Sequence, residues 1–253
     1  MLAVYSKNDI AGINIAKFLK EYVETFSVSD ILHCEEELKG IKEDCIIFVS
    51  RHKSEKGLPC FTVHTPGNFG KAEFGGKDRE ICIASPNEMK TILINIDKHV
   101  EIGKLKKVGW EVCMECTHHG PYIEIPCFFV EIGSSENEWK NELAAKIVAE
   151  AIISSSFKPY KWPVAFGVGG THYCPKFTKY ELASAREGNP FAFSHVLPNY
   201  HVDEIDYETF KKGITMSREK VSKVLIDWKG LKSAQREKVI SFIKKCGIEY
   251  EKV

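Results

Sequence analysis

The histidines of this sequence have the most potential for chemistry, because five of the nine lie next to apolar, strand-like segments. These five are His52, His64, His118, His119 and His172. Glycine or proline accompanies all of them except His52, and these residues fix unusual backbone angles that keep a loop rigid. Rigid loops that carry imidazoles suit a metal site or acid–base catalysis. The sequence has no HExxH spacing, so the prediction of a metal site rests on the group as a whole.

Backbone geometry limits the adjacent pair His118-His119. Neighbouring side chains of an extended chain point to opposite faces, so we expect the two rings not to bind the same ion. Either the chain turns at Gly120-Pro121 and the rings enter two sites, or one ring binds metal and the other acts as a base or orients a ligand. Glu115 and Glu131 are the nearest candidate carboxylates, although Glu131 is equally suited to capping the next helix or pairing with a lysine.

Two further segments are candidates for substrate contact. Gly169 and Gly170 follow a strand and allow close approach of a ligand to the backbone, although glycine pairs are also common in turns. Lys176 and Lys179 belong to a segment, residues 158–179, in which aromatic residues alternate with lysines. That mixture suits base stacking and phosphate contact, whereas most such lysines only form a solvated face. The C-terminal helix expected over residues 233–246 is a second basic patch.

Composition excludes several classes of protein. Lys+Arg and Asp+Glu both total 35, so a protein that grips long duplexes by charge is not expected, and any contact with nucleic acid must be local. The apolar start reads as a buried strand rather than a signal peptide, and no apolar run is long enough to span a membrane. The nine cysteines are an odd number, and most lie in apolar runs. We expect reduced, buried thiols in a cytoplasmic protein, with Cys113 and Cys116 as packing residues.

The elements that must position these residues alternate between strands and helices. We expect strands at 1–5, 45–50, 80–84, 108–116, 128–132, 164–168, 191–197 and 223–228. We expect helices at 9–22, 85–99, 136–154, 204–215 and 233–246. This order predicts one α/β domain over residues 1–253, with three α/β/α layers around a largely parallel or mixed sheet. The histidines then lie beyond the carboxyl ends of strands, where open sheets place their sites.

Five motifs, taken together, resemble one known family. They are SRHKS (50–54), TVHTPGN (62–68), ECTHHGP (115–121), VEIGSS (130–135) and GGTHYCPKF (169–177). In this order they are similar to the motifs of archaeal- and plant-type D-aminoacyl-tRNA deacylases. The resemblance runs from residue 1 to about 200 and continues more loosely to the end. It implies a phosphorylase/hydrolase-like fold and hydrolysis of the ester between a D-amino acid and the 3′ end of tRNA.

The resemblance also implies a cofactor, and it places His52, His64, His118, His119 and His172 inside matching motifs, whereas the other site residues are expected from their types and positions. The cofactor is zinc, as one or two ions, which makes an activated water available near neutral pH. The expected metal ligands are His52, His64, His118 and His172. The expected catalytic groups are Glu115, His119 and Glu131. The expected substrate contacts are Thr65, Pro66, Gly67, Asn68, Gly169, Gly170, Lys176 and Lys179. Among these, residues 65–68 are a candidate rigid wall that rejects L-amino acids by steric clash.

The expected partner is a tRNA that carries a D-amino acid, with neither DNA nor a membrane. Two other functions stay open on the residues alone. One is a zinc-dependent exopeptidase or amidohydrolase acting on free peptides. The other is a non-catalytic tRNA-binding module in which the histidines are structural. Metal content and turnover of aminoacyl-tRNA against dipeptides distinguish the three.

Overall fold

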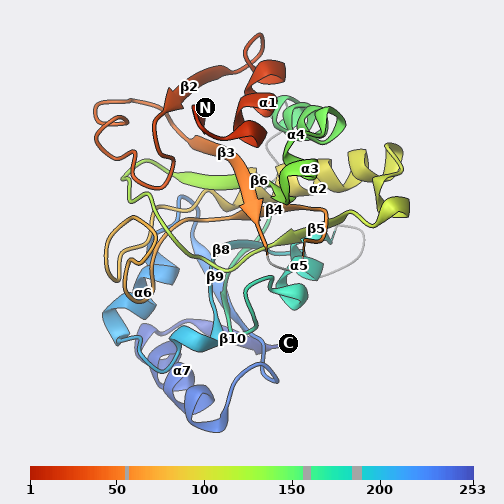
Figure 1. Cartoon of the computed structure of the whole chain (residues 1–253). Coiled ribbons are helices and arrows are strands. Elements are labelled where there is room, and N and C mark those ends of the chain that lie inside the picture. Colours follow the sequence, from red (N-terminus) through yellow and green to blue (C-terminus); the bar gives the residue numbers. More distant parts are fainter. Residues whose placement is uncertain (55–56, 156–160, 184–189) are drawn as a thin grey trace.

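The computed structural model describes residues 1–54, 57–155, 161–183 and 190–253. Over these residues the strands form two sheets, which lie in the upper and lower parts of Figure 1. The six-stranded sheet has the order β2 (Glu24–Val28), β1 (Leu2–Ser6), β3 (Ile46–Lys53), β6 (Cys127–Ser134), β4 (Cys60–His64) and β5 (Glu111–Met114). The four-stranded sheet has the order β10 (Glu249–Lys252), β9 (Val221–Ile226), β7 (Val164–Val168) and β8 (Ala192–Leu197).

Within these sheets every neighbouring pair of strands is parallel except β4 with β6. The expected α/β class with parallel and mixed sheets is therefore confirmed. The strands divide between two sheets, however, where the sequence suggested one. The single-domain organisation stays a prediction.

One face of the six-stranded sheet carries the polar residues of interest. Ser50 of β3 and Thr62 of β4 both lie beside Glu131 of β6. Because side chains alternate between the faces, His52 and His64, each two residues further along, project from the same face as Glu131. Ser50, Glu131 and Thr62 form a row across the three strands. Because β3 and β4 run in opposite directions, His52 and His64 lie on opposite sides of this row. The antiparallel pair thus places both rings on the sheet face, where we had expected loops beyond the strand ends.

Three helices cover the opposite face of this sheet: α1 (Ile10–Leu19), α2 (Pro86–Ile102) and α4 (Glu142–Ser155). Their apolar side chains meet Val49 and Val130 in the main hydrophobic core. α1 lies directly against β3, because a Cβ at Gly12 would stand only 2.6 Å from the carbonyl oxygen of Val49. Asp9 caps α1 and also accepts a hydrogen bond of 2.8 Å from the amide of Arg51. These contacts fix the end of β3 that carries His52.

The four-stranded sheet has its own hydrophobic core. Phe166 and Val224 of the sheet pack with side chains of α6 (Tyr207–Thr215) and α7 (Ser233–Cys246). On the other face, Phe193 packs with Phe177 of α5 (Pro175–Leu182), and this contact belongs to the main core. A 3-10 turn, η2 (Asn199–His201), follows β8. Each sheet is therefore covered by helices of its own, but side chains from both sheets contribute to the main hydrophobic core.

The segment after β5 joins the two sheets. The amide of Glu115 donates to the carbonyl of Val63 at 2.9 Å, which extends the pairing of β5 with β4. Two residues later, the amide of Thr117 donates to the carbonyl of Val196 in β8 at 3.0 Å. Between them, the amide of Cys116 donates to the carbonyl of His172 at 2.8 Å. The chain thus crosses from one sheet to the other immediately before His118 and His119.

Several local predictions need correction. Residues 80–84 are not a regular strand and make only isolated bridges, at Ile81 and Ala84. Ser85 is the N-cap residue of α2, but its hydroxyl donates to Glu88 at 2.9 Å and makes no capping bond to the backbone. The helix expected at 136–154 is interrupted and forms α3 (Glu136–Trp139) and α4. A 3-10 turn, η1 (Leu105–Val108), precedes β5, and β2, α5 and β10 were not anticipated. Among the described helices, none has the length and apolar character that crossing a membrane requires.

Candidate metal-binding active site

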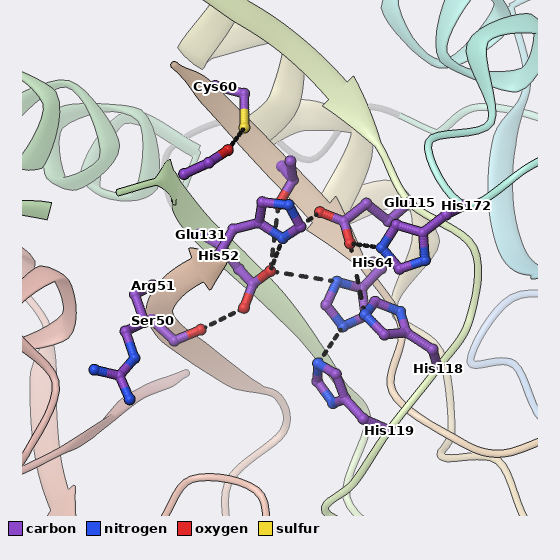
Figure 2. A network of polar contacts seen from close by, with 12 residues as sticks. Ser50, Arg51, His52, Cys60, His64, Glu115, His118, His119, Glu131 and His172 are labelled. Atoms are coloured by element: carbon purple, nitrogen blue, oxygen red, sulfur yellow. Dashed lines mark hydrogen bonds and ion pairs between the residues drawn. The ribbon is translucent and has the colours of Figure 1, made fainter. Parts of the chain in front are cut away.

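Three groups of metal-ligand side chains meet on the polar face of the six-stranded sheet, in the part of the chain that the structure describes (Figure 2). The first group is His52, Glu115 and Glu131. The Nδ1 atom of His52 lies 3.1 Å from Oε1 of Glu115 and 3.5 Å from Oε2 of Glu131. Glu131 also accepts hydrogen bonds from the hydroxyls of Ser50, at 2.6 Å, and Thr62, at 3.3 Å. The row of paired residues seen in the sheet therefore fixes this carboxylate.

The second group is His64, His118 and His119. His119 has a left-handed backbone with a φ of 46°. This conformation turns the chain, so the rings of His118 and His119 lie on the same side with centroids 4.3 Å apart. The rings therefore do not diverge into two sites, which was the first of the two alternatives, because the backbone at His119 is not extended. The Nε2 atoms of His64 and His119 are 3.2 Å apart.

The third group is Cys116, His118 and His172. The thiol of Cys116 lies 3.6 Å from Nδ1 of His172, and Nε2 of His172 lies 2.8 Å from Oε2 of Glu115. His118 belongs to the second and third groups, and its Nε2 lies 3.5 Å from the same oxygen of Glu115. Glu115 therefore contacts three of the rings, those of His52, His118 and His172, as Figure 2 shows.

Hydrogen bonds to the outer ring nitrogens orient the histidines. Nδ1 of His118 lies 2.8 Å from the carbonyl of Cys116, and Nδ1 of His119 lies 2.6 Å from the carbonyl of Gly120. A carbonyl oxygen can only accept, so we assign the proton of each ring to Nδ1, and each Nε2 keeps its lone pair for a ligand. His52 is held similarly, with Nε2 2.9 Å from the hydroxyl of Tyr173. Metal-binding histidines are usually fixed in this way.

The electrostatics of the cluster favour metal binding. Burial, together with the neighbouring rings, lowers the pKa of both His64 and His118 well below the usual value, so both are neutral. Burial alone would raise the pKa of Glu115, but the contact with His172 and the neighbouring rings of His52 and His118 lower this pKa to about 2. Neutral imidazoles around an ionised carboxylate are the protonation states that a cation requires.

His172 behaves differently. Burial acts to lower the pKa of His172, but its contacts with Cys116 and Glu115 outweigh burial and raise this pKa to about 10. The ring therefore carries a positive charge at neutral pH when it faces Glu115 without an ion. A metal ion at this position must displace that proton, because only the neutral ring is a ligand.

The donor set fits a zinc ion. Both oxygens of Glu115 are buried and accept no well-formed hydrogen bond from the described residues, although three rings surround them. A buried carboxylate in that state is costly unless a cation satisfies it, either the imidazolium of His172 or, once that proton is lost, a metal ion. The separation of Nε2 in His64 and His119 is close to the spacing of about 3.3 Å that two nitrogen ligands have on a tetrahedral zinc. Imidazole, carboxylate and thiolate are also the ligands that zinc uses.

A cleft with a volume of about 1230 Å³ opens over the cluster. The site residues that line it are His52, His118, His119, Glu131 and His172. Glu115 and His64 lie beneath this surface, with 1% and 0% of their areas exposed. The cleft is therefore large enough for a substrate. It exposes Glu131 and several ring nitrogens of the cluster, and carboxylates outside the cluster, such as Asp30, Glu73 and Glu204, also line it.

The candidate wall at residues 65–68 reaches the cleft only in part. Gly67 and Asn68 line it. Thr65 and Pro66 are not among the described residues that line it, and the hydroxyl of Thr65 donates to the carbonyl of Ser194 at 2.9 Å. The backbone of Gly67 lies against Ile81 with no space for a Cβ, and its φ is 144°. Of the four residues of the candidate wall, only Gly67 and Asn68 therefore border the cleft.

The other predicted substrate contacts lie away from the cleft. Gly169 and Gly170 have left-handed backbones and pack against Asp227, beyond β9. The ammonium group of Lys176 pairs with the same aspartate at 2.6 Å, and Lys179 is exposed on α5. Residues 158–160 of the predicted basic segment lie outside the described residues. The structure therefore does not bring Lys176 or Lys179 to the metal-ligand cluster, although His172 of the same segment belongs to it.

Among the residues that sequence reasoning missed, three belong to the cluster or contact it. Cys116 was expected only to pack in the core, and its thiol belongs to both the core and the third group. Tyr173 orients His52, and its place directly after His172 was the signal available. Tyr200 lines the cleft and touches the thiol of Cys116 at 3.2 Å. Tyr200 has no local signal in the sequence. It lies in η2, and η2 comes close to the cluster only because β8, the strand before it, pairs within the four-stranded sheet.

Known proteins match nearly the whole chain. The family model described as D-aminoacyl-tRNA deacylase matches residues 39–251. A D-aminoacyl-tRNA deacylase of Pyrococcus furiosus is 40% identical over 251 residues, covering 98% of this chain and 86% of the relative. The enzyme of that name from Methanocaldococcus jannaschii is 37% identical and covers 100% and 99%. A crystal structure described as a conserved protein of unknown function superposes with a TM-score of 0.90 at 33% identity, covering 99% and 94%. With the metal-ligand cluster in the cleft, these matches confirm that the chain belongs to the D-aminoacyl-tRNA deacylase family and is an ester hydrolase of that kind.

Proposed function

We propose that this chain hydrolyses the ester of D-aminoacyl-tRNA with the help of zinc held in the cluster, and so releases the D-amino acid and tRNA. The observation that carries the proposal is Glu115, a buried carboxylate that is surrounded by imidazoles and accepts no well-formed hydrogen bond from the described residues. When bound, zinc supplies a Lewis acid that activates water and polarises an ester carbonyl at neutral pH. The family implies the substrate.

The residues of the cluster divide into two roles. We assign Glu115 and the rings of His64, His118 and His172 to holding metal, since Glu115 and His64 lie beneath the cleft surface. The group of His52, Glu115 and Glu131 shares no residue with that of His64, His118 and His119, which leaves room for two ions.

Glu131 is the candidate base. It lines the cleft, and hydrogen bonds from Ser50 and Thr62 hold its carboxylate in place. It can therefore accept the proton of the attacking water. His119 also lines the cleft, and its Nδ1 is occupied by the carbonyl of Gly120, so its Nε2 faces the reacting groups. We propose that His119 orients the ester or completes the metal shell.

Discrimination against L-amino acids is assigned to the rigid wall at Gly67 and Asn68. The side-chain amide of Asn68 donates to the carbonyl of Gly75 at 2.9 Å, and the backbone of Gly67 packs against Ile81. A wall fixed in this way excludes one enantiomer by clash and needs no contact with the side chain of the other. The cleft therefore accepts many D-amino acids and rejects L-forms of any size.

The deciding experiment measures deacylation of D-tyrosyl-tRNA and L-tyrosyl-tRNA by the protein as purified, after chelation, and after zinc is restored. We expect rapid release from the D-form, at least about 100-fold slower release after chelation, and recovery with zinc. Metal content should be one or two zinc ions per chain. Full activity in a protein shown to be free of metal would remove zinc from the reaction. Equal rates on the two enantiomers would remove the steric wall, and faster cleavage of dipeptides would favour a peptidase.

A further inference from the structure

Two exposed aromatic side chains line the cleft. Phe74 has 66% of its area exposed and Tyr200 has 51%. The other large hydrophobic side chains exposed in the described residues, such as Tyr22 at 70%, lie outside the cleft. Single exposed hydrophobic residues are common on protein surfaces. Two rings in the cleft that holds the metal-ligand cluster are a feature of this site and need a ligand to cover them.

The loop that carries Phe74 is held rigidly. The carbonyl of Phe74 accepts a hydrogen bond of 2.9 Å from the amide of Gly120, next to His119. The following residue, Gly75, has a φ of 76° and lies against the carbonyl of Leu32 with no space for a Cβ. From the other side, the side-chain amide of Asn68 donates to the carbonyl of Gly75 at 2.9 Å. The backbone is thus fixed while the ring of Phe74 stays open to solvent.

Tyr200 is held from the opposite end of the same segment. Its hydroxyl lies 3.2 Å from the thiol of Cys116, and its ring packs against His201 with centroids 4.8 Å apart. Phe74 is therefore attached at Gly120 and Tyr200 at Cys116. Between these two points lie His118 and His119, so the two rings flank the reactive loop.

Cationic side chains are also found in the cleft. Arg51, Lys53 and Lys71 all line it. Lys53 and Lys71 form no ion pair with any described residue, in contrast to Lys176, which is paired with Asp227. The guanidinium of Arg51 lies 5.3 Å from the ring centroid of Trp139, which leaves its donors available to an anion. The cleft thus combines aromatic surfaces with unpaired positive charge.

We propose that Phe74 and Tyr200 are stacking surfaces for the unpaired bases at the 3′ end of tRNA, while Arg51, Lys53 and Lys71 contact its phosphates. The inference rests on the proposed function, because it places the ester of the terminal nucleotide at His118 and His119. Proteins recognise single-stranded RNA by stacking its bases on aromatic rings and by tracking its backbone with basic side chains. The formal net charge of the chain is zero, so a large basic surface is not expected. Stacking, with a few local phosphate contacts, lets the protein bind the end common to all tRNA molecules without such a surface.

The test uses a C-C-A trinucleotide whose 3′ end carries D-tyrosine through an amide, so that no hydrolysis occurs. Its dissociation constant is measured by calorimetry at several salt concentrations. We expect Phe74→Ala to raise the dissociation constant by about tenfold or more, the scale of one lost stacking contact, without changing its dependence on salt. We expect Lys71→Gln to reduce the slope of log affinity against log salt by about 0.7, the value for one phosphate contact of a single strand.

Two variants serve as matched controls. Phe74→Tyr keeps a ring and should bind within about twofold of the unchanged protein. Tyr22→Ala removes an equally exposed ring outside the cleft and should not alter binding. Phe74 is exposed, so neither substitution at that position removes a core contact. Zinc content, measured in parallel, shows whether the cluster is intact.

Failure of this inference is distinguishable from failure of the proposed function. If the unchanged protein deacylates D-tyrosyl-tRNA but Phe74→Ala binds the trinucleotide as tightly as Tyr22→Ala does, the stacking surfaces are refuted and the deacylase stands. If the protein releases no D-tyrosine at all, the proposed function fails whatever the trinucleotide does. A salt slope unaltered by Lys71→Gln would remove Lys71 from phosphate contact.

Discussion

Glu115 shows how one residue can organise a site. It lies beyond the end of β5, fully buried, with ring nitrogens of His52 and His172 3.1 and 2.8 Å from its oxygens. Its pKa of about 2 keeps it ionised across the neutral range, since those rings outweigh the effect of burial. A fixed negative charge at this position would offset the positive charge of a metal ion held by the surrounding imidazoles.

At the residue scale we predict that Glu115→Gln loses both zinc and activity. The amide has the same shape but no charge, so it cannot offset the cation, and we expect turnover to fall by at least about 100-fold. Elemental analysis and deacylation of D-tyrosyl-tRNA measure the two effects. The control is Glu111→Gln, the same change four residues earlier on the exposed start of β5. Normal zinc content and activity in Glu115→Gln would exclude this carboxylate from the site.

Among the elements, α1 and β3 form the support of the cluster. Asp9 at the start of α1 binds the amide of Arg51, next to His52, and the glycine at position 12 lets the helix rest on the carbonyl of Val49. The close approach explains why a small residue is needed in the first turn, although glycine weakens a helix by itself. The position of His52 therefore depends on a contact formed on the far side of the strand.

At the element scale we predict that Gly12→Ala destabilises the protein although alanine favours helix. The added methyl group would meet the backbone of β3, and overpacking of this kind lowers the free energy of unfolding by about 1–3 kcal/mol. Urea unfolding followed by circular dichroism measures the change. Gly103→Ala is the control, because a Cβ there would stand 3.1 Å from the carbonyl of His99 and meet no strand. Equal unfolding midpoints for the two variants would contradict close packing of α1 on β3.

At the scale of the whole molecule, the cluster is assembled where the two sheets join. His195 of β8 is buried at this junction, and its Nε2 donates to the carbonyl of Cys82 at 3.0 Å. Burial lowers the pKa of His195 from 6.5 to about 4. The ring links the four-stranded sheet to the segment before α2 in either protonation state, and burial penalises its charged form.

The lowered pKa of His195 predicts that the free energy of unfolding of the whole protein decreases in acid. Between pH 6.5 and about 4 the unfolded chain binds a proton at His195 and the folded chain does not, so stability is complete above pH 6.5 and falls as the pH decreases. The loss amounts to about 3 kcal/mol. We expect His195→Gln, which can still donate to Cys82, to lack this part of the pH dependence. Unfolding of both proteins at pH 7 and pH 4.5 measures it, and parallel curves would contradict the assignment.

The sequence by itself determined the chemistry and the class of fold. The motifs around His52, His64, His118 and His172 identified the family, and alternation of apolar runs with helical patterns predicted an α/β protein, because both signals are local. Local signals also located most helices. They could not reveal that Cys116 joins the cluster, since a buried cysteine after a strand has the same pattern whether it packs or binds metal.

Only the tertiary structure decided how the site is assembled. The antiparallel direction of β4 depends on pairing of Thr62 with Glu131, far apart in the sequence, and it placed His52 and His64 on the sheet face. The left-handed backbone of His119 brought two adjacent rings to one side, against the rule for extended chains. Which lysines reach the cleft was likewise undetermined, because ion pairing of Lys176 with Asp227 depends on how β7 and β9 pair. Strand order, backbone handedness and charge pairing arise from contacts between distant segments, and such contacts leave no periodic trace in the sequence.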